Sequence, residues 1–297
     1  MSKLSKWTDW IKIKSGIAEN SARLDRIEKK LALSLALQRS ILPEKLIFPQ
    51  EIFDVVHKWH SQLGEGTTEI HKNDIMFLFS LHHHYGDWGK ALDEYMETGY
   101  QMAHSLSDIV KKQGVSVKSV LDFGSGYGRV SRFFKVAFPE AKVSVSEVKS
   151  QSLIFQRDVF GYTPIEHTEE PSSFRAPQQY DLIFAGSVFT HLPSKRFKEW
   201  LEMLIASLTD EGILVFSVHN IQDLAEPSLE PFVFVEHSED QVMSEIGDRI
   251  KDATEYGSAY IHHDTLREWV NEYNGIPREV IRLGFGGTQD LCVVSRR

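Results

Sequence analysis

Residues 120–129 read VLDFGSGYGR, from Val120 to Arg129, and they join two kinds of sequence pattern. An apolar run with the character of a strand precedes them at 119–123, and a helical pattern follows at 130–138. The glycines between permit a tight turn and let a ligand lie against bare backbone. Because open α/β sheets bind ligands at the carboxyl ends of their strands, this segment predicts a ligand-binding turn between a strand and a helix.

The chain downstream of Lys118 alternates between strand and helix patterns. The strand-type runs lie at residues 119–123, 142–147, 162–165, 182–185 and 212–218, and the helical runs at 130–138, 150–159 and 194–208. Such alternation predicts right-handed crossovers and a parallel sheet covered on both faces. Two more strands are expected at 279–285 and 290–295, joined in hairpin style by Gly286 and Gly287, which predicts an antiparallel end to the sheet.

Residues 1–114 have helical patterns instead. The apolar stripe over 17–38 predicts an amphipathic helix that either packs on its own domain or forms a homodimer interface. Further helices are expected at 51–60 and over 73–114, with a break near Gly86. We therefore expect an N-terminal helical region, residues 1–114, and an α/β domain, residues 115–297.

The α/β domain is expected to carry an insert at about residues 220–260. This acidic, irregular stretch contains Pro227 and Pro231 and a strand-like run at 232–235. A helix is expected to begin after it, with Asp264 as its N-cap.

Composition limits the classes of partner and compartment. The 297-residue chain has a formal net charge of -9, which argues against a nucleic-acid partner held by phosphate contacts. Cys292 is the only cysteine, so neither an intramolecular disulfide nor a cysteine-based zinc site is expected, as suits a reducing cytoplasm. The charged N-terminus fits neither a signal peptide nor a membrane span.

Two details of the glycine turn indicate which cofactor it holds. A dinucleotide fingerprint needs G-x-G-x-x-G, but here Arg129 stands where the third glycine should be, and Gly128 comes one place early. The Asp122 carboxylate would also repel a pyrophosphate. S-adenosylmethionine lacks phosphate and carries a sulfonium and an ammonium, so the turn favours it over a nicotinamide dinucleotide.

With this turn the chain resembles the class I, Rossmann-like methyltransferases, whose first motif is approximately [VIL]-L-D-x-G-x-G-x-G. The match at residues 120–128 is complete, and the resemblance covers about 119–297. It implies a three-layer α/β/α sandwich with a mostly parallel, seven-stranded sheet and an antiparallel last strand. It also implies that S-adenosylmethionine is bound by Asp122, Gly124, Ser125, Gly126, Gly128 and Arg129.

The resemblance implies further cofactor contacts outside the turn. Glu147, at the end of the second strand, would accept hydrogen bonds from both ribose hydroxyls. Gly186 and Ser187 follow the fourth strand, where the family's loop borders the methyl group and the acceptor. Tyr95 and Gly99 resemble a Y-x-x-x-G pattern on a helix that folds over the cofactor; the alternative is a core tyrosine and a glycine of helix packing.

Methyl transfer is an in-line displacement, and a hydroxyl or ammonium acceptor must also lose a proton to a base. His191, just after the fourth strand, is the first candidate, and His219, after the fifth, is the second; His262 and His263 lie near the same edge. The alternative is that these histidines cap or pack the loops.

Further residues are candidates for a metal site and for the acceptor pocket. Adjacent residues point in different directions, so a metal site at His82-His83-His84 is not expected. The N-terminal helices and residues 221–263 are expected to build the acceptor pocket. Tyr256, Tyr260 and Trp269 are either lining or core residues.

The absence of two motifs restricts the class of acceptor. No [DNS]-P-P-[YFW] follows the fourth strand and no Pro-Cys pair exists, which argues against methylation of adenine, glutamine or cytosine C5. A small molecule, sugar or glycolipid precursor, or a peptide side chain, remains, with O- or N-methylation. Among the subgroups of the family, the chain most resembles bacterial enzymes that modify surface polysaccharides or secondary metabolites, and this point rests on resemblance alone. The alternatives are an inactive methyltransferase fold that binds or regulates, and an NAD(P)-dependent oxidoreductase.

Overall fold

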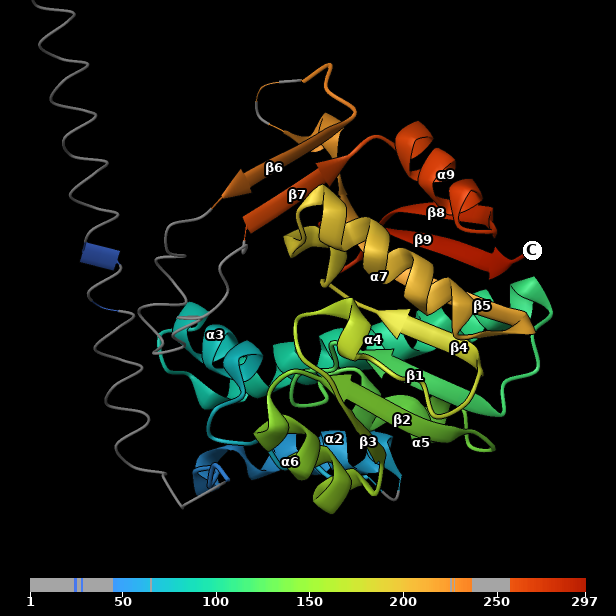
Figure 1. The fold of residues 1–297 in the computed structure, drawn as a ribbon. Coiled ribbons are helices and arrows are strands. Elements are labelled where there is room, and N and C mark those ends of the chain that lie inside the picture. Colours follow the sequence, from blue (N-terminus) through green and yellow to red (C-terminus); the bar gives the residue numbers. More distant parts are fainter. Residues whose placement is uncertain are drawn as a thin grey trace, which may run out of the picture.

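The computed structural model describes residues 24, 25, 28, 45–64, 66–224, 226, 228–236 and 257–297 (Figure 1). Of the helix expected over residues 17–38, only Leu24, Asp25 and Glu28 are among them, so its packing and the homodimer interface stay predictions. Tyr256 and much of the expected insert lie outside the described residues.

The strands of the described residues form one sheet, shown in Figure 1. They are β1 (Ser119–Phe123), β2 (Lys142–Glu147), β3 (Thr163–Glu166), β4 (Tyr180–Ala185), β5 (Leu208–Asn220), β6 (Phe232–Glu236), β7 (Gly257–Ile261), β8 (Gly275–Phe285) and β9 (Gln289–Arg296). β3, β2, β1, β4 and β5 are neighbours in that order and pair in parallel. β9 is antiparallel to β5, and β8 to β9. The predicted parallel sheet with an antiparallel last strand is confirmed.

The β6–β7 hairpin is an addition to this sheet. β7 pairs in parallel with the last two residues of β5, through His219↔Tyr260 and Asn220↔Ile261, and β6 is antiparallel to β7. β7 is not among the strands predicted from the sequence, and the predicted fifth strand ends at residue 218. β5 extends to Asn220 because β7 supplies the hydrogen-bonding partner for its last residues.

Helices connect most of the strands and make up the N-terminal region. They are the α-helices α2 (Phe53–Leu63), α3 (Ile75–His83), α4 (Trp88–Gln113), α5 (Phe134–Ala137), α6 (Ser150–Phe160), α7 (Ser194–Ala206) and α9 (His263–Glu272), and the 3-10 helices η1 (Gln50–Ile52), η2 (Ser131–Phe133), η3 (Pro171–Ser173), η4 (Phe189–His191) and η5 (Ile221–Asp223). In the part of the chain that the structure describes, no helix combines the length and apolarity needed to cross a bilayer.

Capping residues explain where several helices begin. The Asp74 side chain accepts hydrogen bonds from the first turn of α3, and Asp87 does the same for α4. Gly86, with φ +77°, lies between them, so the predicted break is confirmed. The expected N-cap of α9 was wrong, because the N-cap position belongs to His262, whereas Asp264 lies inside the first turn.

Alternate residues of each strand face two separate hydrophobic cores, as the strand period requires. Val120 and Leu182 pack with the helices of one face, among them α4 and α6. Leu121 and Ile183 pack with α7 and α9 on the other face. Figure 1 shows the resulting three layers, which confirms the expected α/β/α sandwich. Since α4 shares a core with the sheet, the expected boundary at residue 114 stays a prediction.

Candidate active site

The glycine turn after β1 leaves one face of its backbone bare. Gly124 and Gly126 have φ angles of +69° and +55°, a region that side chains disfavour. A Cβ on Gly124 would lie 2.4 Å from the Val188 side chain, so this glycine allows the loop after β4 to approach. A Cβ on Gly126 would meet nothing within 4 Å. The turn therefore has a cradle at Gly126 that a side chain would fill.

Hydrogen bonds hold the turn against β2 and α6. The Gly124 amide donates to the Ser146 carbonyl over 2.8 Å, and Gln156 Nε2 donates to Ser125 Oγ over 2.8 Å. Glu147, the predicted ribose ligand, lies beside the turn, where its Oε2 accepts from the Gly126 amide over 3.0 Å. Its Oε1 accepts from the Val148 amide over 2.8 Å. The structure thus brings the predicted turn and the predicted ribose ligand together.

Asp122 lies buried beneath the turn, with 3% of its surface exposed. Burial raises the pKa of its carboxyl to about 7; the Ser131 hydroxyl lowers that pKa and the charge of Glu147 raises it. A buried carboxylate is costly unless a positive charge or hydrogen bonds compensate. This position therefore suits a cationic ligand and disfavours an anionic one.

Tyr95 belongs to a buried chain of polar groups that ends on the turn. Its hydroxyl donates to Asp74 Oδ2 over 2.6 Å and accepts from Arg132 Nη2 over 3.1 Å. Arg132 Nε in turn donates to the Gly128 carbonyl over 3.0 Å. The structure places Tyr95 one residue away from the turn, with Arg132 between, and its contact with a cofactor stays a prediction.

Gly99 marks the closest approach of α4 to the turn. A Cβ there would lie 2.0 Å from the Arg129 carbonyl oxygen, so α4 can pack against the turn only if residue 99 is glycine. Arg129 itself is partly exposed. Burial lowers the pKa of its guanidinium, whereas the nearby acidic groups Asp74 and Glu94 raise it. Both predicted residues lie at the turn.

The loop after β4 packs against the glycine turn at Gly124. Gly186 has no room for a side chain, because its Cβ would lie 2.6 Å from the Phe184 ring. Ser187 has a left-handed backbone, with φ +59°, and Val188 next to it fills the space beside Gly124. The predicted residues Gly186 and Ser187 are therefore next to the glycine turn.

Two of the predicted histidines lie near each other at the carboxyl end of β5. His191 Nδ1 is 2.9 Å from the Gly257 carbonyl oxygen, and the His219 ring stacks on Tyr260 with centroids 5.2 Å apart. Burial lowers the pKa of His219, and the neighbouring His191 lowers it further. Since Nδ1 of His191 faces a carbonyl, that nitrogen carries the proton in the neutral ring and Nε2 is the proton-accepting atom.

Asp290, which was not among the predicted site residues, organises this edge. Its fully buried carboxylate accepts from His263 Nε2 over 2.8 Å, from Arg282 Nη1 over 2.7 Å and from the Leu283 amide over 2.9 Å. Burial alone would raise the pKa of Asp290, but these hydrogen bonds outweigh it and hold the pKa below the usual value. The available signal was an acidic residue directly before the apolar run 291–294 of β9.

The remaining candidates lie elsewhere or within the core. His84 Nε2 is 3.2 Å from Glu94 Oε2, between α3 and α4, and no cluster of potential metal ligands occurs among the described residues. Trp269 packs on Phe197 with ring centroids 5.4 Å apart, in the core beneath α7. His262 is the N-cap residue of α9.

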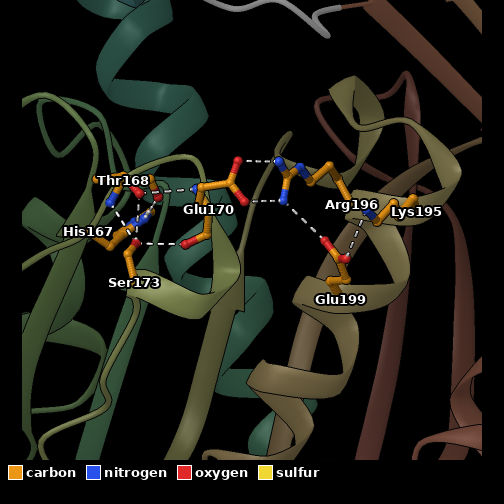
Figure 2. Close-up of polar contacts among 7 residues, drawn as sticks. All are labelled: His167, Thr168, Glu170, Ser173, Lys195, Arg196 and Glu199. Carbon is orange, nitrogen blue, oxygen red and sulfur yellow. Dashed lines mark hydrogen bonds and ion pairs between the residues drawn. The ribbon is translucent and has the colours of Figure 1, made fainter.

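Ionic contacts tie the segment between β3 and β4 to α7 (Figure 2). The His167 ring stacks on Phe123, the last residue of β1, with centroids 5.2 Å apart. Arg196 of α7 forms a two-point ion pair with Glu170, one bond of which spans 2.6 Å, and also contacts Glu199 over 3.2 Å. The segment between β3 and β4 is therefore held against both β1 and α7.

A model of the methyltransferase domain family matches residues 92–274, more than half of the chain. The chain belongs to this family. The prediction of a Rossmann-like, S-adenosylmethionine-dependent methyltransferase, drawn from the glycine turn, is thereby confirmed. The match spans α4, the glycine turn, both candidate histidines and α9.

Several known methyltransferases are similar to this one. The malonyl-[acyl-carrier protein] O-methyltransferase of Acetivibrio thermocellus is 23% identical over 147 residues, which are 49% of this chain and 51% of that protein. The chain therefore matches about half the length of this curated relative.

Solved structures with a similar fold share little sequence. An S-adenosylmethionine-dependent methyltransferase from Clostridium acetobutylicum has 10% identity and a TM-score of 0.49, covering 66% of this chain and 91% of that one. An amino pentose methyltransferase from Micromonospora echinaspora has 14% identity and a TM-score of 0.49, covering 67% of this chain and 92% of that one.

Proposed function

We propose that this methyltransferase moves a methyl group from S-adenosylmethionine to oxygen or nitrogen of a small-molecule, sugar or glycolipid-type acceptor. The cradle at Gly126 beside the buried carboxyl of Asp122 is the observation that carries the cofactor assignment. A bare backbone admits the ligand at close range, and the carboxyl favours a positive charge there.

The residues around the cradle divide the work of holding the cofactor. The turn from Gly124 to Gly128 supports its body, Asp122 favours its positive charge, and Glu147 can accept the ribose hydroxyls once it leaves the Gly126 amide. Bound S-adenosylmethionine supplies a methyl group on a positively charged sulfur. Gly186 and Ser187 then close the side of the cradle that faces β5.

We assign removal of the acceptor's proton to the histidines at the carboxyl end of β5. A ring that is neutral near pH 7 can take a proton from an acceptor hydroxyl or ammonium, and the lowered pKa keeps His219 neutral. His191 is favoured as the base because its Nδ1 contact with Gly257 leaves Nε2 as the proton-accepting atom. His219 is the second choice.

The acceptor class is argued from charge and from the residues of this edge. A net charge of -9 disfavours a polyanionic acceptor such as nucleic acid. Imidazoles that accept a proton are useful for a hydroxyl or amine acceptor, which must lose one during transfer. A small polar molecule with such a group fits both facts.

Calorimetric titration with S-adenosylhomocysteine tests the cofactor assignment, with NADH as the comparison ligand. We expect S-adenosylhomocysteine to bind and NADH to give no heat. Binding of NADH alone would instead indicate an oxidoreductase and overturn the proposal.

The acceptor is tested by mass spectrometry of cell extracts incubated with the protein and S-adenosylmethionine. We expect a small polar metabolite to gain the mass of one methyl group. Cofactor binding without methylation of any extract component would indicate an inactive fold with a binding or regulatory role.

A further inference from the structure

Ser187 adopts a backbone conformation that serine rarely takes. Its φ of +59° lies in the left-handed region, where the side chain crowds the backbone. A residue other than glycine stays in such a conformation where its surroundings hold it, and these residues gather at functional sites. Ser187 follows β4 directly, at the carboxyl edge of the sheet.

Two buried side chains hold Ser187 in a closed ring of hydrogen bonds. The Ser187 amide donates to Ser217 Oγ over 2.6 Å, and Ser217 Oγ donates to Gln289 Oε1 over 2.6 Å. Gln289 Nε2 then donates to Ser187 Oγ over 2.9 Å. Ser217 is fully buried and Gln289 is 8% exposed, so water competes little with these bonds. We call these three residues the polar ring.

The polar ring fixes the direction in which the Ser187 hydroxyl points its hydrogen. Ser217 uses its one hydrogen on Gln289, and Gln289 uses an amide hydrogen on Ser187. The Ser187 oxygen is therefore an acceptor in the ring, and its own hydrogen points out of it. Thr190 Oγ1 lies 3.4 Å away, which is long for a bond between hydroxyls. The Ser187 hydrogen can thus be donated to a ligand.

The polar ring also sets the distance between two loops of the cofactor site. Val188 follows Ser187, and its side chain fills the position that a Cβ on Gly124 would take, at 2.4 Å. A shift of Ser187 would carry Val188 away from the glycine turn or into it. The backbone of Ser187 is therefore coupled to the shape of the cradle.

We propose that Gln289 and Ser217 are positioning residues of the cofactor site: they hold Ser187 so that its hydroxyl donates to bound cofactor and Val188 abuts the glycine turn. The inference rests on the proposed function, and it gives a task to residues of β5 and β9 that stand far from the glycine turn in sequence. Neither residue needs to contact the cofactor itself.

The test measures the affinity for S-adenosylhomocysteine by calorimetry in the wild type, Gln289→Leu, Gln289→Glu and a control, Gln101→Leu. Gln101 is exposed on α4, where it donates to Glu97. Loss of the ring bonds in Gln289→Leu should weaken binding ~3- to 10-fold, and the control should match the wild type. The thioether probe lacks the sulfonium charge, so a new carboxylate cannot attract it at sulfur.

Gln289→Glu separates positioning from simple support of the fold. A carboxylate can still accept from Ser217, but it cannot donate to Ser187, whose hydrogen would then turn inward to it. We expect this variant to keep a melting temperature nearer the wild type than Gln289→Leu does, yet to bind at least as weakly. Recovery of wild-type affinity in Gln289→Glu would mean that the direction of the hydrogen is irrelevant and would overturn the proposal.

A double-mutant cycle identifies the residue through which Gln289 acts. If it acts through Ser187, the combination of Gln289→Leu with Ser187→Ala weakens binding no more than the stronger single change. Additive losses, or an unchanged affinity in Gln289→Leu, would contradict the proposal. In either case, binding of S-adenosylhomocysteine by the unmodified protein would still support the cofactor assignment. Failure of the wild type to bind S-adenosylhomocysteine would remove the proposed function itself, and the inference with it.

Discussion

The carboxyl edge of the sheet has two halves that are built in different ways. In the cofactor half, around β1 and β2, the contacts join neighbours in sequence: Gly126 and Glu147 are 21 residues apart, and Ser125 and Gln156 are 31 apart. In the histidine half, around β5, β7 and β9, His191 meets Gly257 across 66 residues and Ser187 meets Gln289 across 102. These contacts of the first half lie within residues 125–156, whereas those of the second join segments that are far apart in the sequence.

This difference separates what each half contributes to the molecule. The geometry of the cofactor half lies in local backbone conformation, so we expect single glycines there to determine whether a ligand fits. The histidine half carries buried polar groups from several strands, so we expect single side chains there to affect stability and, under the proposed function, proton transfer. Substitutions in the two halves should therefore have separable effects on binding, turnover and stability.

The largest effect is expected from filling the cradle with Gly126→Val. The matched control is Gly114→Val at the end of α4, because both glycines have positive φ and neither added Cβ would meet an atom within 4 Å. Equal backbone strain should lower both melting temperatures alike, but only Gly126→Val should lose affinity for S-adenosylhomocysteine, by roughly 100-fold or more. Calorimetry that finds both variants equally weak would mean that strain, not ligand space, explains the loss.

A substitution in the histidine half should instead lower turnover and leave cofactor affinity unchanged. With an acceptor identified, His191→Ala should lower kcat roughly 100-fold, as loss of a general base does, and leave the affinity for S-adenosylhomocysteine within about twofold. His83→Ala, an exposed histidine on α3, is the control. An unchanged kcat in His191→Ala would move the role of base to His219.

Stability should depend on Asp290 more than on a surface acid. Asp290→Ala removes the buried carboxylate that accepts from His263, Arg282 and the Leu283 amide, and it should lower the free energy of unfolding by about 2 to 3 kcal/mol in urea titrations. Asp223→Ala, which removes the other partner of Arg282, should cost less than about 1 kcal/mol. Similar losses in both variants would show that Asp290 stabilises the fold no more than a surface carboxylate does.

The pH dependence of that loss has a definite sign. The pKa of Asp290 is lowered in the folded protein, so its contribution is present above the unfolded value of 3.8 and disappears as pH falls through the folded value. The difference between Asp290→Ala and the wild type should therefore shrink in urea titrations below pH 4. A difference that stays constant with pH would contradict the assigned hydrogen bonds.

The smallest effect is expected in the cofactor half, from Asp122→Asn. Burial raises the pKa of this carboxyl to about 7, so the folded protein holds the proton more tightly than the unfolded chain. That contribution is full below pH 3.8 and is lost as pH rises through 7. We therefore compare the free energy of unfolding of Asp122→Asn with that of the wild type, without cofactor, by urea titration. The advantage of Asp122→Asn should grow by about 1 to 2 kcal/mol as pH rises from 5 to 8.5. An advantage that shrinks as pH rises from 5 to 8.5 would mean that the pKa of Asp122 is lowered, not raised.

Sequence predicted the elements whose signal is local. The glycine turn, the run of β2 ending at Glu147 and the Gly286-Gly287 turn between β8 and β9 were all predicted from short patterns, and the positive φ angles of both turn glycines agree. β7 escaped notice because Gly257, Ser258 and Ala259 form no apolar run. Its strand conformation comes from pairing with β5 and β6.

The candidate site followed the same division. Asp122, Gly126 and Glu147 could be named from one motif and the next strand, although their roles toward a cofactor stay predictions. The contact of His263 with Asp290 could not be foreseen, since nothing in either local sequence indicates the other. The expected cap Asp264 was wrong for a local reason: its carboxylate pairs with Arg267 over 2.7 Å within the first turns of the helix.

Glu147 begins its encounter with a cofactor already satisfied, because it holds two backbone amide hydrogens. Arrival of a ribose diol would therefore be an exchange of partners, in which the Gly126 amide is handed to the ligand as the hydroxyls take its place. Such an exchange changes the free energy far less than pairing a bare charge would. We expect this carboxylate to discriminate between sugars more than it tightens binding, and to retake its amide when the spent nucleoside leaves.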